Sequence, residues 1–142
     1  MKKILLFLLM VFALQLFGQN TPTKGDSIQF LKCQCRNWSG TATISFYPLI
    51  NTNKAITVKC NGEVGLANVG TYQVTAPNFI CNPASCKATF KWVVAGPVTG
   101  NGAGKIFNFN FSAYGSYIVT ILPICGNQKC ETCKFTIVIK KE

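Results

Sequence analysis

The chain has 142 residues, with fourteen Lys and Arg residues, four acids, eight cysteines and no histidine. The absence of histidine excludes the Ser-His and Cys-His couples on which many hydrolases depend. An even number of cysteines in a short chain is typical of a small exported domain that disulfides stabilise. The composition therefore favours an extracellular protein that is not an enzyme and uses no cofactor.

The first eighteen residues have the composition of a secretion signal. Lys2 and Lys3 precede an apolar stretch over residues 4–17, and the small residue Gly18 offers a cleavage point. This stretch is too short and too close to the start to be a membrane span. No later apolar stretch approaches the length that a membrane span needs. We expect a signal peptide at 1–18 and a chain that is secreted or held at the cell surface, with no membrane span.

The rest of the chain is expected to contain one domain. Residues 19–41 are predicted to be a polar leader with the first cysteine pair, and residues 42–142 a single β-sandwich domain. After removal of the signal, twelve Lys and Arg residues face four acids, a net charge of +8. Such a charge favours association with polyanions, although dispersed lysines are also typical of an ordinary solvated surface.

From Ala42 onward the sequence predicts strands throughout. Short runs rich in Val, Ile, Thr, Phe and Tyr are separated by Gly, Asn and Pro clusters. Several runs alternate, as where Phe90, Trp92 and Val94 share one face, and this is typical of antiparallel sheets with one solvated face. We therefore predict an all-β fold, a β-sandwich. Its strands are expected near 42–47, 55–60, 63–67, 70–76, 87–95, 105–112, 115–122 and 134–140.

Two short patterns give finer expectations. Asn61-Gly62 follows the strand expected at 55–60 and accepts the positive φ angles of a two-residue type I′ hairpin. Residues 70–75 and 115–120 share the pattern Gly-[Ser/Thr]-Tyr-x-Val-Thr. This echo fits two equivalent strands of a Greek-key sandwich, or chance in a chain rich in β-forming residues.

A family resemblance lies in two of the predicted strands. Residues 111–121, Phe-Ser-Ala-Tyr-Gly-Ser-Tyr-Ile-Val-Thr-Ile, resemble the penultimate strand of bacterial PKD-like modules of the immunoglobulin superfold. Residues 89–92, Thr-Phe-Lys-Trp, are similar to their third strand, where a tryptophan enters the core. The resemblance implies an immunoglobulin-like (PKD-like) antiparallel β-sandwich. It also implies a role as a spacer, an adhesion module or a glycan-binding accessory of a secreted protein.

All the cysteines lie after the signal, and we expect them to be committed to disulfides. They are Cys33, Cys35, Cys60, Cys81, Cys86, Cys125, Cys130 and Cys133. A zinc site built from cysteines would need reduced thiolates, so no metal is expected.

Spacing gives only partial guidance on the pairing. Cys33 and Cys35 are too close to pair with each other and should have different partners. The Asn-Pro turn within residues 81–86 could join the two cysteines at its ends. A late cysteine could clip the loop over residues 125–133, and Cys60 is expected to be buried on the face of its strand.

The acids and nucleophiles do not form a catalytic set. Glycoside hydrolysis needs two carboxyl groups across a cleft, and Asp26, Glu63, Glu131 and Glu142 are scattered through the sequence. No Ser-x-x-Lys motif is present either. We therefore expect no enzymatic activity.

Aromatic residues are the remaining candidates for a site. Five are predicted to be core residues: Phe90, Trp92, Phe107, Phe109 and Phe111. Trp38, Tyr47 and Tyr114, with Arg36 beside the tryptophan, are candidates for stacking on sugar rings or bases. Packing against an edge of the sandwich explains Trp38 equally well.

The sequence thus predicts a secreted, non-enzymatic binding or adhesion module at the cell surface or in the extracellular matrix. Its partner would be an extracellular glycan, an anionic polymer or a surface protein. One alternative is a cationic exoprotein that binds acidic glycan or extracellular nucleic acid. Another is a disulfide-rich inhibitor that presents the loop Ala95–Gly104.

Overall fold

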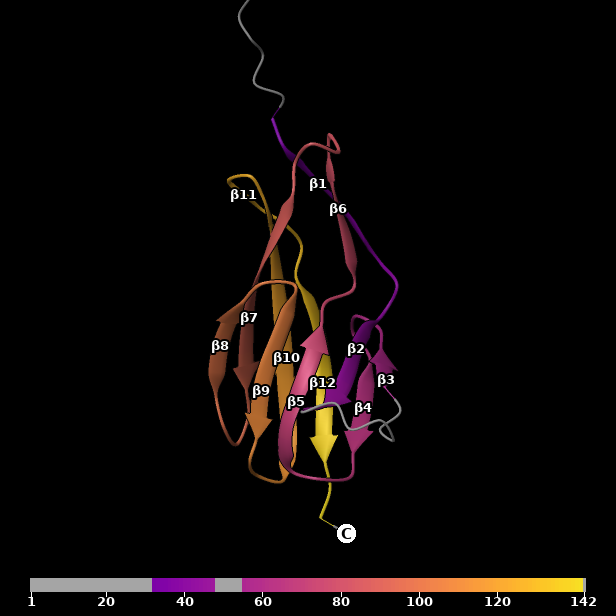
Figure 1. The fold of residues 1–142 in the computed structure, drawn as a ribbon, viewed down its shortest axis with the longest axis vertical. Helices are drawn as coiled ribbons and strands as arrows, with labels where there is room; N and C mark the ends of the chain where they lie inside the picture. Colours follow the sequence, from indigo (N-terminus) through magenta and orange to yellow (C-terminus); the bar gives the residue numbers. More distant parts are fainter. Residues whose placement is uncertain (1–31, 48–54, 142) are drawn as a thin grey trace, which may run out of the picture. The chain divides into compact units, whose positions relative to one another are not determined.

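The structure, a computed structural model, describes residues 32–47 and 55–141, which form an all-β fold (Figure 1). These residues contain no helix with the length and apolarity needed to cross a membrane. The predicted signal peptide lies outside the described residues. Two sheets pack on each other through their apolar faces, and a smaller two-stranded sheet accompanies them.

The larger sheet has the strand order β4-β12-β10-β7-β8, with the two-residue strand β11 paired to the end of β10. Its pairs are antiparallel except for β4 and β12, which run parallel. The central strand β10 is the longest. The bounds are β4 Glu63–Leu66, β7 Ala88–Ala95, β8 Gly100–Ala103, β10 Gly115–Cys125, β11 Gln128–Lys129 and β12 Cys133–Ile139.

The four-stranded sheet has the order β3-β2-β5-β9 and is antiparallel throughout. A third, two-stranded sheet joins β1 to β6. In Figure 1, β1 and β6 lie near the end of β10, whereas the β9–β10 turn lies at its start. The bounds are β1 Gln34–Ser39, β2 Ala42–Phe46, β3 Ile56–Val58, β5 Gly70–Thr75, β6 Asn78–Asn82 and β9 Ile106–Phe111.

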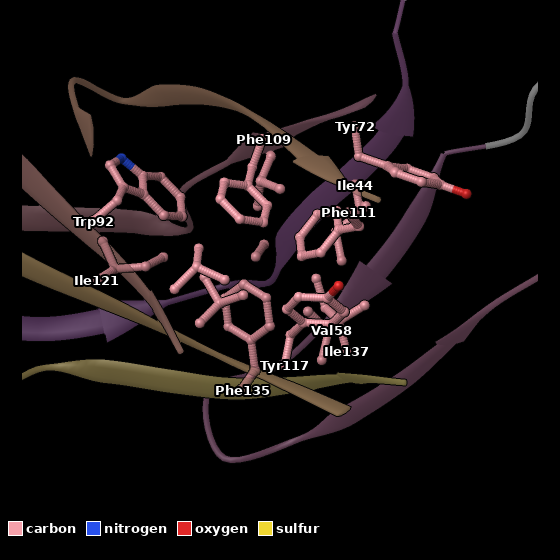
Figure 2. Close-up of a cluster of buried hydrophobic side chains, with 14 of the residues drawn as sticks. Ile44, Val58, Tyr72, Trp92, Phe109, Phe111, Tyr117, Ile121, Phe135 and Ile137 are labelled. Atoms are coloured by element: carbon pink, nitrogen blue, oxygen red, sulfur yellow. The ribbon is translucent and has the colours of Figure 1, made fainter. Parts of the chain in front are cut away.

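The core lies between the two large sheets. Alternate residues of each strand point inward, so one apolar face of each sheet is removed from water. Figure 2 shows aromatic rings from both sheets meeting there, with Phe111 4.9 Å from Tyr117 between ring centroids. Phe90, Trp92, Phe109 and Phe111 are buried as predicted. Phe107 is only partly buried and stacks on Trp92 at 5.4 Å.

The repeated Gly-[Ser/Thr]-Tyr pattern occupies equivalent positions in the two sheets. Gly70 begins β5 and Gly115 begins β10, and both have a positive φ. Two residues later, the hydroxyls of Tyr72 and Tyr117 donate to backbone carbonyls four residues earlier in the chain, each at 2.8 Å. The echo therefore marks two equivalent strands, each anchored to its preceding turn by a tyrosine.

Every strand predicted from Ala42 onward is present, with boundaries that differ by at most three residues. Four strands were not predicted, namely β1, β6, β8 and β11. β1 lies within the range expected to be a leader, because Gln34–Ser39 shows no apolar alternation. β8 lies within the loop Ala95–Gly104 proposed for an inhibitor, and it pairs with β7 along its length.

The predicted hairpin at Asn61-Gly62 is wrong. β3 belongs to the four-stranded sheet and β4 to the larger one, so the turn carries the chain from one sheet to the other. Only Asn61 has a positive φ, of 63°, and the N–H of Gly62 donates to the Lys59 carbonyl at 3.0 Å. A positive φ at the third residue of a turn is the type II geometry, which does not require the paired strands of a hairpin.

All eight cysteines form disulfides, and no free cysteine is present. The bridges are Cys33–Cys86, Cys35–Cys130, Cys60–Cys133 and Cys81–Cys125. Cys33 and Cys35 have different partners, as predicted. The two local guesses, a bridge across residues 81–86 and a clip within 125–133, are wrong, because every bridge joins distant segments. Cys60 is half-buried, since it lies in the turn that follows the edge strand β3.

Candidate functional site

A shallow apolar groove lies between β6 and the start of β7, with a volume of about 330 Å³. We call it the β6–β7 groove. Its walls are mostly apolar, and Lys87 and Lys105 are the two charged residues in its lining. The Lys105 Nζ donates to Asn78 Oδ1 at 3.1 Å. The full lining is Phe79, Ile80, Cys81, Ala84, Cys86, Lys87, Ala88, Phe90 and Lys105.

Trp38 packs against two of the residues that line this groove. It pairs with Phe79 across β1 and β6. Its ring lies 4.8 Å from that of Phe79 and 6.1 Å from that of Phe90, both of which line the groove. The indole N–H donates to the Glu131 carbonyl at 2.9 Å. Arg36 is exposed in the irregular stretch of β1 between Cys35 and Trp38. The Trp38 side chain therefore packs against residues that line the groove, from the neighbouring strand β1.

Tyr47 lies on a different surface, the outer face of the four-stranded sheet. Its N–H donates to the Thr71 carbonyl at 2.8 Å, and its side chain is 44 % exposed. The strand alternation places only uncharged side chains on this face beside Tyr47. They are Thr43, Ser45, Thr57, Thr71, Gln73, Thr75, Ile106, Asn108 and Asn110.

Tyr114 stands apart from the groove. It precedes β10 and is 48 % exposed. Trp38 contacts Phe90, which pairs with Pro123 near the other end of β10. At about 3.4 Å per residue, the nine residue steps from Tyr114 to Pro123 span about 30 Å. The four residues proposed from the sequence therefore do not form one site, and only Trp38 and Arg36 lie on the strand that flanks the groove.

The sulfur atoms of Cys35, Cys125 and Cys130 lie within 4.8 Å of one another. Each of them belongs to a disulfide, Cys35 with Cys130 and Cys125 with Cys81. A zinc site would need deprotonated thiols, which bridged cysteines do not supply. This cluster is therefore two adjacent disulfides.

Charge is strongly unbalanced in the described part of the chain. It contains ten basic residues but only two acids, Glu63 and Glu131. Cations therefore outnumber carboxylates five to one within residues 32–47 and 55–141. All ten are exposed: Lys32, Arg36, Lys59, Lys87, Lys91, Lys105, Lys129, Lys134, Lys140 and Lys141.

Sequence reasoning missed the groove because one of its walls is formed by the unpredicted strand β6 and the turn that follows it. The apolar run Phe79-Ile80-Cys81 before the Asn-Pro turn was the available signal.

Among the titratable groups of the described residues, the Tyr72 phenol has a pKa raised above its ordinary value by burial. Comparison with family models, with curated proteins and with solved structures gives no match for this chain.

Proposed function

We propose that the chain is an exported, non-enzymatic binding module that attaches to an anionic extracellular polymer through the β6–β7 groove. The observation that carries the proposal is the pair of lysines, Lys87 and Lys105, beside an apolar wall. An acidic sugar ring offers matching chemistry, since it has an apolar face and a carboxylate. An ammonium–carboxylate hydrogen bond is stronger than a neutral one.

The charge of the domain supports this choice of partner. Ten exposed cations against two acids attract a polyanion from a distance and raise its association rate. The groove would then determine where the polymer is held. Four disulfides agree with an exported chain, since such bridges persist in oxidising compartments.

We further propose that the fold is of the immunoglobulin type and that PKD-like modules are its relatives. Three observations support this. β10 lies between β7 and β12, as strand F lies between C and G in immunoglobulin domains. Tyr117 makes the contact of a tyrosine corner at the start of that strand. Trp92 is fully buried on the strand that corresponds to C.

Binding to polygalacturonate, an acidic polysaccharide, tests the proposal. Affinity is measured by biolayer interferometry over a range of salt concentrations for the wild type and two double variants. Lys87→Gln with Lys105→Gln removes the charges of the groove. Lys59→Gln with Lys140→Gln removes two exposed charges that do not line the groove, with the same change in net charge.

We expect the groove variant to bind about tenfold more weakly than the wild type, because charge-assisted contacts are lost. The control variant should lose only the small share that follows from net charge. Equal losses in the two variants would show that net charge alone binds the polymer and would refute the groove as the binding site. Absence of wild-type binding at low salt would refute an acidic polysaccharide as the partner.

A further inference from the structure

Within residues 32–47 and 55–141, no further strand pairs with the β9 edge of the four-stranded sheet. The two large sheets end in the strands β3, β9, β4 and β8. β3 has three residues, β4 has four including Glu63, and β8 has four including two glycines. β9 has six residues, Ile-Phe-Asn-Phe-Asn-Phe, with no charge and no proline. Proteins commonly protect an edge with charges, prolines or short strands, and β9 has none of these.

The register shows which backbone groups of β9 are free. The Ala76 N–H donates to the Lys105 carbonyl at 2.9 Å, and Phe107 and Phe109 lie opposite Val74 and Tyr72. Hydrogen-bonding direction alternates along an antiparallel strand. The N–H and C=O groups of Lys105, Phe107, Phe109 and Phe111 therefore face β5. Those of Ile106, Asn108 and Asn110 face the open edge.

We propose that two copies of this chain pair through β9, antiparallel, about a two-fold axis at Asn108. Each Asn108 then faces its own counterpart, and Ile106 of one copy faces Asn110 of the other. The three residues with free backbone groups meet in this register, and each pair exchanges two hydrogen bonds. Such a contact is self-complementary, as a closed dimer requires.

The side chains suit a second copy as the occupant. No charged residue lies on the outer face of β2, β5 or β9, so no like charges meet there despite the net charge of +10. The Asn108 amides of the two copies each carry donors and an acceptor. On the inner side, Phe107 of one copy would lie opposite Phe109 of the other, in a pair without hydrogen bonds between the two residues.

Site-specific cross-linking tests the register, which is independent of the groove. In a hydrogen-bonded antiparallel pair the two Cα atoms lie about 5.5 Å apart, within the range that a disulfide spans. Asn108→Cys should therefore give a covalent dimer in a glutathione redox buffer. Asn110→Cys should give no covalent dimer, since it faces Ile106, and adding Ile106→Cys should restore the cross-link. Peptide mapping confirms that the four native bridges remain.

A charge test measures the same contact without new cysteines. Light scattering after size exclusion should show the wild-type mass rising towards a dimer with concentration. Asn108→Lys places two ammonium groups face to face at the axis and should keep the chain monomeric. Gln73→Lys, on the neighbouring strand β5 of the same face, should still dimerise. A monomeric wild type at every concentration, or equal cross-linking of the two single cysteine variants, would overturn the proposal.

Discussion

Three of the four disulfides form one closed covalent circuit, and this changes what each contributes to stability. Cys33 and Cys35 are two positions apart in the sequence, Cys81 and Cys86 are five positions apart, and Cys125 and Cys130 are five positions apart. The bridges between these segments complete a ring in which the three sequence separations add up to twelve. If any one of the three is removed, the other two still hold its ends together through this short path.

The length of this path sets the expected loss of stability. In the chain-entropy treatment, the stabilisation from a bridge increases with the logarithm of the length of the loop that it closes in the unfolded chain. Cys35–Cys130 has a sequence separation of 95, which alone corresponds to about 4.7 kcal/mol. With the other bridges intact it closes only the circuit of twelve positions, which corresponds to about 2.8 kcal/mol.

The fourth bridge has a longer detour. Without Cys60–Cys133, the shortest connection has twenty-five positions from Cys35 to Cys60 and three from Cys130 to Cys133, through the bridge Cys35–Cys130. This corresponds to about 3.6 kcal/mol. Although its sequence separation of 73 is smaller than 95, this bridge should therefore contribute more than Cys35–Cys130.

Guanidinium unfolding of paired Cys→Ala variants, followed by circular dichroism, measures both losses. The Cys33–Cys86 pair is the matched control, because its cysteines are half-buried like Cys35 and Cys130 and it closes the same circuit. It should lose the same free energy as the Cys35–Cys130 pair. A loss near 4.7 kcal/mol for Cys35–Cys130, exceeding that for Cys60–Cys133, would refute the circuit and show that the bridges act independently.

Three further predictions concern the core. Tyr117→Phe should lower the free energy of unfolding by about 1 kcal/mol in urea unfolding, since the Ala113 carbonyl loses its donor. Burial raises the pKa of Tyr72, so its contribution to stability is complete below its ordinary pKa of about 10 and falls as pH rises above it; thermal melts of Tyr72→Phe should lack this loss. Gly102→Ala should lower stability by about 1–3 kcal/mol in the same melts, because its Cβ would lie 2.3 Å from the Phe107 ring. Gly65→Ala, where the nearest atom is 4.0 Å away, is the control.

Alternation along the strands predicted much of the core, although Phe107 and Cys60 are only partly buried. Phe90, Trp92 and Val94 are 6 %, 0 % and 1 % exposed, because a sheet with one solvated face gives its apolar residues a period of two. The same rule failed for β8, whose glycines resemble a turn. Gly100 and Gly102 are there because the rings of Phe109 and Phe107 occupy the space that a Cβ would need. That requirement comes from the opposite sheet.

The disulfides and the groove depend on contacts that sequence spacing does not contain. Cys81 and Cys86 suggested a local bridge, but β6 runs beside β1, so Cys81 lies opposite Cys35 and bonds to Cys125 instead. Trp38 was a candidate ligand residue because it stands in a polar stretch. Its ring packs against residues that line the groove because β1 pairs with β6, a strand that was not predicted.

The circuit and the β6–β7 groove share the segment 81–86, which two bridges hold at its two ends. A wall fixed in this way would need little ordering to bind the proposed polymer, so we expect the bridges to increase affinity as well as stability. Opening Cys33–Cys86 should therefore weaken polygalacturonate binding by the folded protein more than opening Cys60–Cys133, which does not line the groove. For stability the expected order is the opposite, because opening Cys60–Cys133 should cost more free energy of unfolding than opening Cys33–Cys86. The binding and unfolding measurements on the same two variants test this crossover, and parallel losses in both would mean that the groove depends on general stability alone.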